Sequence, residues 1–146
     1  MSDYSMLING ESVGAEGSIE VLNPATETAI ATVPEASLAQ LDDAVAAARG
    51  ALPGWSAHSM DERRALILKI ADRLEENIGE LAQLLSEEQG KPIEGFAGLG
   101  AMFELGGSLA WIRYTASLDL PVEVIQDNDE ARIEVHRKPV GVVGSI

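Results

Sequence analysis

The final seven residues place the strongest constraint on what this chain can fold into. They are almost entirely apolar or small: Val140-Gly141-Val142-Val143-Gly144-Ser145-Ile146. Such a run is typical of a strand that is buried on both faces of a parallel sheet. A parallel sheet needs several such strands joined by crossover helices, and no earlier segment offers a comparable strand. The sequence therefore predicts that residues 139–146 begin the central sheet of an α/β protein, and that the chain is the front part of a longer one.

The start of the chain is typical of short strands separated by tight turns. Asn9-Gly10 lies between two short β-like stretches, and this dipeptide accepts the positive φ angles of a two-residue hairpin turn. Residues 18–22 and 28–33 carry further β-branched side chains on either side of Asn23-Pro24-Ala25-Thr26, a turn sequence. Because strands of this size are only marginally stable alone, we expect a small β-appendage that packs on a larger body.

The middle of the chain predicts four helices. Ser37-Leu38-Ala39-Gln40 and Ser59-Met60-Asp61-Glu62 both fit a capping box, which satisfies free backbone amides at a helix start. We expect the first helix to stop at Pro53-Gly54, and the third to run from Asn77 to Gly90. Apolar spacing predicts a fourth helix over about residues 93–118, with several glycines that lower its intrinsic helix propensity.

After Pro121 the apolar period changes from that of a helix to that of a strand. Apolar and polar residues alternate on both sides of the polar turn Asp127-Asn128-Asp129, which predicts a β-ribbon within residues 121–138. The pattern alone allows two interpretations. The ribbon is either an edge hairpin of the same domain or an arm that pairs with another subunit, because long exposed edges otherwise invite aggregation.

Composition excludes several classes of function. The 146 residues carry 10 Lys and Arg against 24 Asp and Glu, a net charge of −14, which argues against binding to nucleic acid or an anionic membrane surface. The chain has no cysteine, so it has no disulfide, no Cys-ligated metal and no thiolate nucleophile of its own. No apolar run approaches the length of a membrane span and the first residues do not resemble a signal peptide, so we expect a cytoplasmic protein.

Spacing and composition alone identify no catalytic residue. Gly98-Leu99-Gly100 lacks the third glycine and the preceding strand of a dinucleotide fingerprint. His58 and His136 have no neighbours at metal-ligand spacing, and we expect both at the surface. Glu104 lies within an apolar, glycine-rich stretch, so it is either simply exposed or partly buried with a partner such as Arg113 or a cation.

Six segments, taken together and in order, resemble the N-terminal part of the NAD(P)-dependent aldehyde dehydrogenase superfamily. Each motif is weak by itself, but together they extend over essentially the whole chain. They are Ile8-Asn9-Gly10-Glu11; Asn23-Pro24-Ala25-Thr26 followed by Ile30-Ala31-Thr32-Val33; Trp55 with the helix from Glu62 to Leu68; Glu88-Gln89-Gly90-Lys91-Pro92-Ile93; Trp111-Ile112-Arg113-Tyr114; and Arg137-Lys138-Pro139 leading into the final apolar run.

The resemblance implies an α/β enzyme with a Rossmann-like cofactor domain, a catalytic domain and a β-arm used for oligomerisation. It implies attack of a cysteine thiolate on an aldehyde, hydride transfer to NAD or NADP, and hydrolysis of the thioester by glutamate-activated water. In the family the cysteine, the glutamate, an oxyanion-holding asparagine and a ribose-binding lysine all lie beyond the position of Ile146. The lack of cysteine agrees with the family only if the chain is a fragment.

Three residues carry over from the family to positions of this sequence. Ile146 matches a position at the end of the first cofactor-domain strand, beside the bound nucleotide. Glu104 matches an acidic position that helps hold a structural monovalent cation in some members, and the main-chain carbonyl of Leu22 matches another ligand. One departure concerns this site, because the stretch from Gly90 to Glu104 is about one helical turn longer than the commoner family spacing.

Residues 1–120 are accordingly interpreted as the N-terminal strands and the helical part of a cofactor-binding domain. Residues 121–138 form the oligomerisation ribbon and 139–146 the first strand of the Rossmann-like sheet, so that this fragment is mainly helical. The leading hypothesis is an aldehyde dehydrogenase that forms a homo-oligomer and whose N-terminal fragment is inactive alone. The alternative is a non-catalytic helical oligomerisation module.

Overall fold

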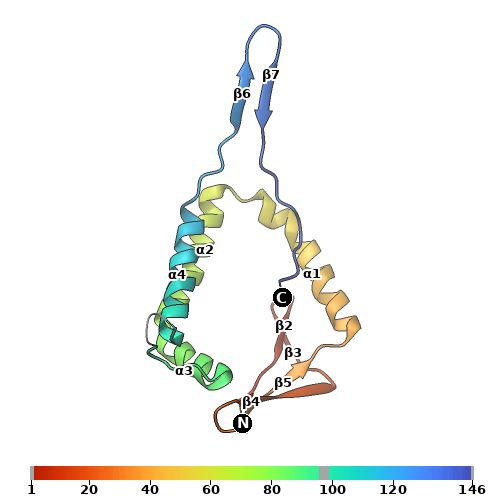
Figure 1. Cartoon of the computed structure of the whole chain (residues 1–146). Helices are drawn as coiled ribbons and strands as arrows, with labels where there is room; N and C mark the ends of the chain where they lie inside the picture. Colours follow the sequence, from red (N-terminus) through yellow and green to blue (C-terminus); the bar gives the residue numbers. More distant parts are fainter. Residues whose placement is uncertain (1, 96–98, 146) are drawn as a thin grey trace.

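A computed structural model describes residues 2–95 and 99–145 of the chain. Its described elements form an open ring from which a two-stranded ribbon projects (Figure 1). Three of the helices lie along one side of the ring and the remaining helix along the other, and the N-terminal strands close the end opposite the ribbon. The mainly helical character expected of this chain is confirmed.

The N-terminal strands form two small sheets. Strands β2 (Met6–Ile8) and β3 (Glu11–Val13) make an antiparallel hairpin. Its turn residues Asn9 and Gly10 have φ angles of 53° and 80°, so the predicted two-residue hairpin is confirmed. The second sheet has the order β1-β5-β4. Its strands are β1 (Ser2–Asp3), β4 (Gly17–Asn23) and β5 (Thr28–Glu35), with β1 parallel and β4 antiparallel to β5.

Helix α1 (Leu38–Ala57) begins where the sequence predicts and ends later. The Ser37 side chain accepts a hydrogen bond from the Gln40 backbone, and the Gln40 side chain accepts one from the Ser37 backbone, which completes the capping box. The predicted stop at Pro53-Gly54 is wrong, because Pro53 lies inside the helix and His58 is its C-cap. A proline removes only its own amide donor, and here the helix continues beyond that missing bond.

The next two helices begin and end close to the positions that the sequence predicts. Helix α2 (Met60–Glu76) starts with a complete capping box between Ser59 and Glu62. Helix α3 (Ile78–Gln89) ends at Gly90, which adopts the left-handed conformation with φ 71°. A Cβ atom at this glycine would lie 2.8 Å from Cγ of Pro24, so the turn also packs tightly against the β4–β5 connection.

The fourth helix is shorter than expected. Helix α4 spans Ala101–Ser117, whereas residues 90–95 form an irregular turn that folds back on the start of the helix. The carbonyl oxygens of Pro92 and Ile93 accept hydrogen bonds from the amides of Ala101 and Met102. A Cβ atom at Gly100 would lie 2.3 Å from the backbone nitrogen of Gly95, so this close backbone approach replaces the first turns of the expected helix.

The predicted ribbon is confirmed, whereas the assignment of residues 139–146 to the first strand of a larger sheet stays a prediction. Strands β6 (Glu123–Asp127) and β7 (Arg132–Val135) pair antiparallel and extend away from the ring (Figure 1). Residues 136–145 form no strand, and the side chain of Val140 is 91% exposed. A strand needs a neighbour to satisfy its backbone, and no described strand pairs with this segment.

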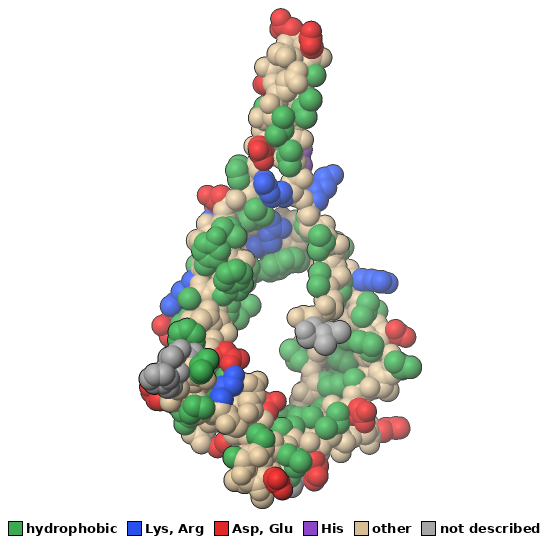
Figure 2. Space-filling model, in the orientation of Figure 1, with side chains coloured by type: hydrophobic (Ala, Val, Ile, Leu, Met, Phe, Trp, Pro, Cys, Tyr) green, Lys and Arg blue, Asp and Glu red, His purple; other side chains and the backbone are tan. Residues whose placement is uncertain are grey.

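Almost every residue buried in the described part of the chain is small. The buried apolar residues are Ala31, Ala71, Ala82, Ala101, Leu109 and Ala116. Four of these alanines lie in α2, α3 and α4, where a small side chain lets helices approach closely. Large apolar side chains instead line much of the inner rim of the ring (Figure 2). None of the helices within the described ranges has the length and apolar character needed to cross a bilayer.

Candidate functional site

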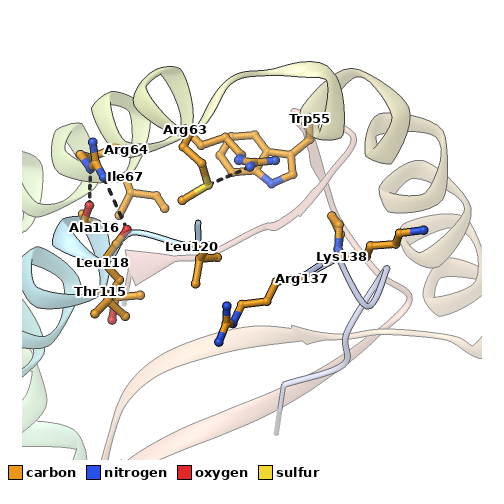
Figure 3. Close-up of a pocket in the computed structure, with 12 residues that line it drawn as sticks. Trp55, Arg63, Arg64, Ile67, Thr115, Ala116, Leu118, Leu120, Arg137 and Lys138 are labelled. Atoms are coloured by element: carbon orange, nitrogen blue, oxygen red, sulfur yellow. Dashed lines mark hydrogen bonds between the residues drawn. The ribbon is translucent and has the colours of Figure 1, made fainter. Parts of the chain in front are cut away.

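An open hollow of about 470 Å³ lies where the ribbon joins the ring (Figure 3). It is bounded by the end of α1, the start of α2, the end of α4 and the two segments that lead to and from the ribbon. Its lining residues are Trp55, Met60, Arg63, Arg64, Ile67, Thr115, Ala116, Leu118, Leu120, Arg137, Lys138 and Pro139. The hollow therefore combines an apolar floor with four cationic side chains.

Arg64 joins α2 to the C-terminal end of α4. Its Nε donates a hydrogen bond of 2.6 Å to the carbonyl oxygen of Ala116, and its Nη2 atom lies 3.5 Å from that of Leu118. The same guanidinium forms ion pairs with Asp61 at 2.6 Å and Asp119 at 2.8 Å. A cation at this place satisfies carbonyls left free at the end of a helix and complements the helix dipole. The guanidinium of Arg64 therefore has close partners and a structural role, which is to connect α2 to the end of α4.

The guanidinium groups of Arg63 and Arg137 make weaker contacts than that of Arg64. Nη2 of Arg63 lies 2.9 Å from the sulfur of Met60, and a thioether is only a weak acceptor. Arg137 reaches the carbonyl oxygen of Pro121 at 3.5 Å and a carboxylate oxygen of Glu123 at 3.8 Å, both at the limit of a useful contact. These two guanidinium groups therefore retain donors that the described residues do not satisfy well.

The structure gives Glu104 a different partner from the one suggested by the sequence. Its carboxylate pairs with Nζ of Lys91, and the side chain is half exposed. Arg113 instead pairs with Glu75 at 2.6 Å and lies 3.9 Å from Asp72. The hydrogen bond that Arg113 donates to the Glu75 carboxylate raises the pKa of Arg113. The suggestion of Arg113 as partner is therefore wrong, because Arg113 faces α2 while Glu104 faces the turn that precedes α4.

The structure leaves the cation site at Glu104 and Leu22 a prediction. Glu104 lies in the first turn of α4, whereas Leu22 lies in β4 at a bulge and pairs with Ala29. Within residues 2–95 and 99–145, no group of three or more His, Asp or Glu side chains is arranged to hold a metal ion. A site made chiefly of main-chain carbonyls would need no such group.

Both histidines lie at the surface, as expected. His58 contacts Trp55 edge-to-face and lies 3.7 Å from Glu62, and His136 lies 2.9 Å from Glu134. The pKa of Glu62 is lowered mainly by the backbone hydrogen bond from Ser59. The pKa of Glu134 is lowered first by Arg132 and then by His136. Hydrogen bonding at helix and ribbon surfaces accounts for both shifts.

The described residues do not provide a dinucleotide site. Ile146, the predicted cofactor contact, lies outside the described residues, as does Gly98 of the partial glycine motif. A dinucleotide is usually held where a strand leads through a glycine-rich turn into a helix, and the described segment that precedes Ile146 forms no strand. The described residues therefore do not form an NAD(P)-binding site by themselves.

Sequence reasoning did not find the hollow, because its cations come from distant parts of the chain. Two basic doublets, Arg63-Arg64 and Arg137-Lys138, provide all four. In a chain with ten Lys and Arg in total, these doublets were the available signal. Nothing in their spacing shows that the return of the chain from the ribbon brings them to one place.

Comparison with known proteins places these features in a family. The sequence pattern of the "Aldehyde dehydrogenase family" matches residues 12–146. Aldehyde dehydrogenase LUC3 from a Fusarium species is 39% identical over 143 residues, which cover 98% of this chain and 30% of that protein.

Solved structures agree with the sequence match. Succinate-semialdehyde dehydrogenase from Burkholderia pseudomallei superposes with a TM-score of 0.84 at 30% identity, covering 94% of this chain and 29% of its own. PnpE, solved in complex with nicotinamide adenine dinucleotide, gives a TM-score of 0.82 at 37% identity, covering 94% and 28%. The chain spans about 30% of the length of the relatives it matches. The resemblance inferred from the sequence motifs is confirmed, and the chain belongs to the aldehyde dehydrogenase family.

Proposed function

We propose that this chain is the N-terminal part of an enzyme that oxidises an aldehyde to a carboxylic acid with NAD or NADP. The observation that supports the proposal most strongly is the family match over residues 12–146, nearly the whole chain. The named relatives act on different aldehydes, so we state the substrate only as that class. PnpE was solved with nicotinamide adenine dinucleotide, which supports the cofactor class. The proposal includes a cytoplasmic location, which cell fractionation would test.

The catalytic groups in this proposal lie outside the 146 residues. The chain has no cysteine to provide a thiolate, and its described part offers no dinucleotide cradle. In the longer polypeptide a cysteine thiolate would attack the aldehyde carbon, and glutamate-activated water would release the acid from the thioester. Bound NAD or NADP supplies the hydride acceptor. Residues 1–146 provide the helical framework and the ribbon.

A second role for the chain is self-association through the ribbon. Val124, Ile133 and Val135 are exposed on β6 and β7, although all three are apolar. The outer edges of a two-stranded ribbon also leave backbone groups unpaired. We therefore propose that the ribbon pairs with another copy to form a homo-oligomer. The alternative, a purely structural oligomerisation module, shares this feature but predicts no aldehyde oxidation.

Kinetic assay of two protein preparations separates these alternatives. One preparation is the complete polypeptide encoded by the reading frame, and the other is residues 1–146 alone. We expect aldehyde-dependent reduction of NAD or NADP by the complete polypeptide and none by residues 1–146, measured by the absorbance of the reduced cofactor. Reactions without aldehyde are the control.

Either of two outcomes would contradict the proposal. Turnover by pure residues 1–146 would show that the catalytic groups are not downstream. No turnover by the folded complete polypeptide, with either cofactor and a panel of aliphatic, aromatic and semialdehyde substrates, would favour the structural module.

A further inference from the structure

Lys91 and Glu104 form an ion pair between the turn after α3 and the first turn of α4. The Lys91 side chain is 24% exposed and that of Glu104 is 50% exposed, so the ammonium is the more buried partner. An ammonium has three donors and no acceptor, and it carries one compact positive charge. At Glu104 it therefore provides what a monovalent metal cation would provide, which is a single positive charge next to the carboxylate.

The main chain holds Lys91 in this place. The Ser86 hydroxyl donates a hydrogen bond of 2.6 Å to the carbonyl oxygen of Lys91, which fixes the residue against the end of α3. The next two carbonyl oxygens accept hydrogen bonds of 2.9 and 3.1 Å from the amides of Ala101 and Met102, which begin α4. The position of the ammonium beside Glu104 therefore does not depend on the ion pair alone.

The described residues do not fit a metal cation beside Glu104. A hard cation takes several oxygen ligands. The main-chain oxygens of Lys91, Pro92 and Ile93 already accept hydrogen bonds from protein donors. The other predicted ligand, the carbonyl of Leu22, belongs to β4, which packs against α3, whereas Glu104 lies on α4. The carboxylate itself is occupied by the Lys91 ammonium.

We infer that the Lys91 ammonium is a built-in replacement for the monovalent metal cation that the family resemblance places at Glu104. The stretch from Gly90 to Glu104 is longer than the commoner family spacing, and its fold-back brings Lys91 to the carboxylate. A bound ion stabilises a fold by an amount that grows with the ion concentration, whereas a tethered ammonium is always present. The stability of this protein therefore does not depend on potassium or sodium at this position.

Thermal unfolding of the complete polypeptide tests the inference, in KCl, NaCl or tetramethylammonium chloride at one ionic strength and one scan rate. The unmodified protein and Glu104→Gln should respond equally to the change of salt, because no metal ion binds at Glu104. Lys91→Met should unfold at a lower temperature in tetramethylammonium chloride, and KCl or NaCl should raise its midpoint until the effect saturates. The double variant Lys91→Met/Glu104→Gln should lose that rise.

Lys69→Met is the matched control. It removes the same charge from an exposed position of α2, so it should keep the response of the unmodified protein to the change of salt. If Lys91→Met does not fold, Lys91→Gln, which keeps a polar side chain, takes its place in the same comparison. Unfolding is the readout throughout, so the result stands whether or not the complete polypeptide oxidises aldehydes.

Three outcomes would overturn the inference. The first is a loss of alkali-specific stabilisation in Glu104→Gln, which would show that a metal ion binds at Glu104 beside Lys91. The second is a Lys91→Met variant that gains no alkali-specific stabilisation. The third is a gain in Lys91→Met that persists in the double variant or appears equally in Lys69→Met, because the ion would then bind elsewhere.

Discussion

Gly90 shows how much one residue can determine in this fold. It ends α3 with a φ of 71°, and its backbone packs against Pro24 in the turn between β4 and β5. The following residue, Lys91, pairs with Glu104 at the start of α4. One turn therefore joins the small sheet, α3 and α4.

Gly90→Ala should lower the free energy of unfolding. A left-handed conformation costs an L-residue about 1–2 kcal/mol, and the added methyl group would also meet Pro24. Gly50→Ala is the matched control, because Gly50 lies within α1 with open space around it and alanine there should stabilise by about 0.5–1 kcal/mol. Urea denaturation of both variants measures the difference. Equal effects of the two substitutions would contradict this account of the turn.

At the residue scale, the sequence predicts local roles better than partners. The capping roles of Ser37, Ser59 and Gly90 follow from neighbours within a few positions, and all three are confirmed. The suggestion of Arg113 as the partner of Glu104 was wrong because the partner depends on which way α4 faces, and the structure pairs Glu104 with Lys91. No local pattern in the sequence contains that orientation.

At the scale of elements, the ribbon is the feature most accessible for contact with another copy. Strands β6 and β7 extend beyond the ring with solvent on both faces (Figure 1). Apolar side chains in that position lower the solubility of a monomer and stabilise a contact between copies. Acidic residues at its tip, Asp127, Asp129 and Glu130, disfavour tip-to-tip stacking and leave the sides and edges as the contact.

Ile133→Glu should therefore weaken self-association. The substitution places a charge on an exposed apolar position of β7, and burying it in a contact between copies would be costly. We expect a lower molar mass in light scattering at a given protein concentration. Glu130→Gln at the tip is the control and should leave the mass unchanged. An unchanged mass for Ile133→Glu would show that the ribbon is not the contact.

The errors in predicting elements have a common physical origin. The stop at Pro53 and the early start of the fourth helix both relied on local propensity. Helix α1 continues because its neighbouring turns remain bonded on both sides of Pro53. Helix α4 starts late because Gly95 and Gly100 allow the backbone to fold back tightly. In both cases contacts with the surrounding chain, and not local propensity, determine where the helix begins or ends.

At the scale of the whole molecule, burial is unusually shallow. Among residues 2–95 and 99–145, the buried apolar residues are five alanines and Leu109, while aromatic and aliphatic side chains lie along the open rim (Figure 2). Large side chains provide most of the free energy that a core contributes. The described elements therefore have little core of their own, in keeping with a chain that spans about 30% of the length of its relatives.

Residues 1–146 alone should bind an apolar dye that the complete polypeptide does not. Trp111 and Val143, at 68% and 70% exposed, are examples of the apolar side chains that we expect the longer polypeptide to cover. Anilinonaphthalene sulfonate fluorescence per mole of protein measures this difference. Equal fluorescence from the two preparations would show that the remaining polypeptide leaves this surface open.

The family and the order of elements were predictable because the motifs depend on short stretches of sequence. The ring and its hollow were not, since they depend on how the chain returns from the ribbon to the start of α2. Arg63 and Arg137 are 74 positions apart in the sequence and line the same hollow only because the chain returns in this way.

The contacts of Arg64 and Arg137 at the base of the ribbon affect how the ribbon can move relative to the ring. Arg64 contacts Leu118 and Asp119 on the segment that leads to the ribbon, and Arg137, on the segment that leads back from it, reaches Pro121. The base of the ribbon is therefore held by α2 and by the C-terminal end of α4. A small rotation of α2 would move the distant tip of the ribbon further than its base, so the ring would set the angle of the contact between copies that we propose for the ribbon.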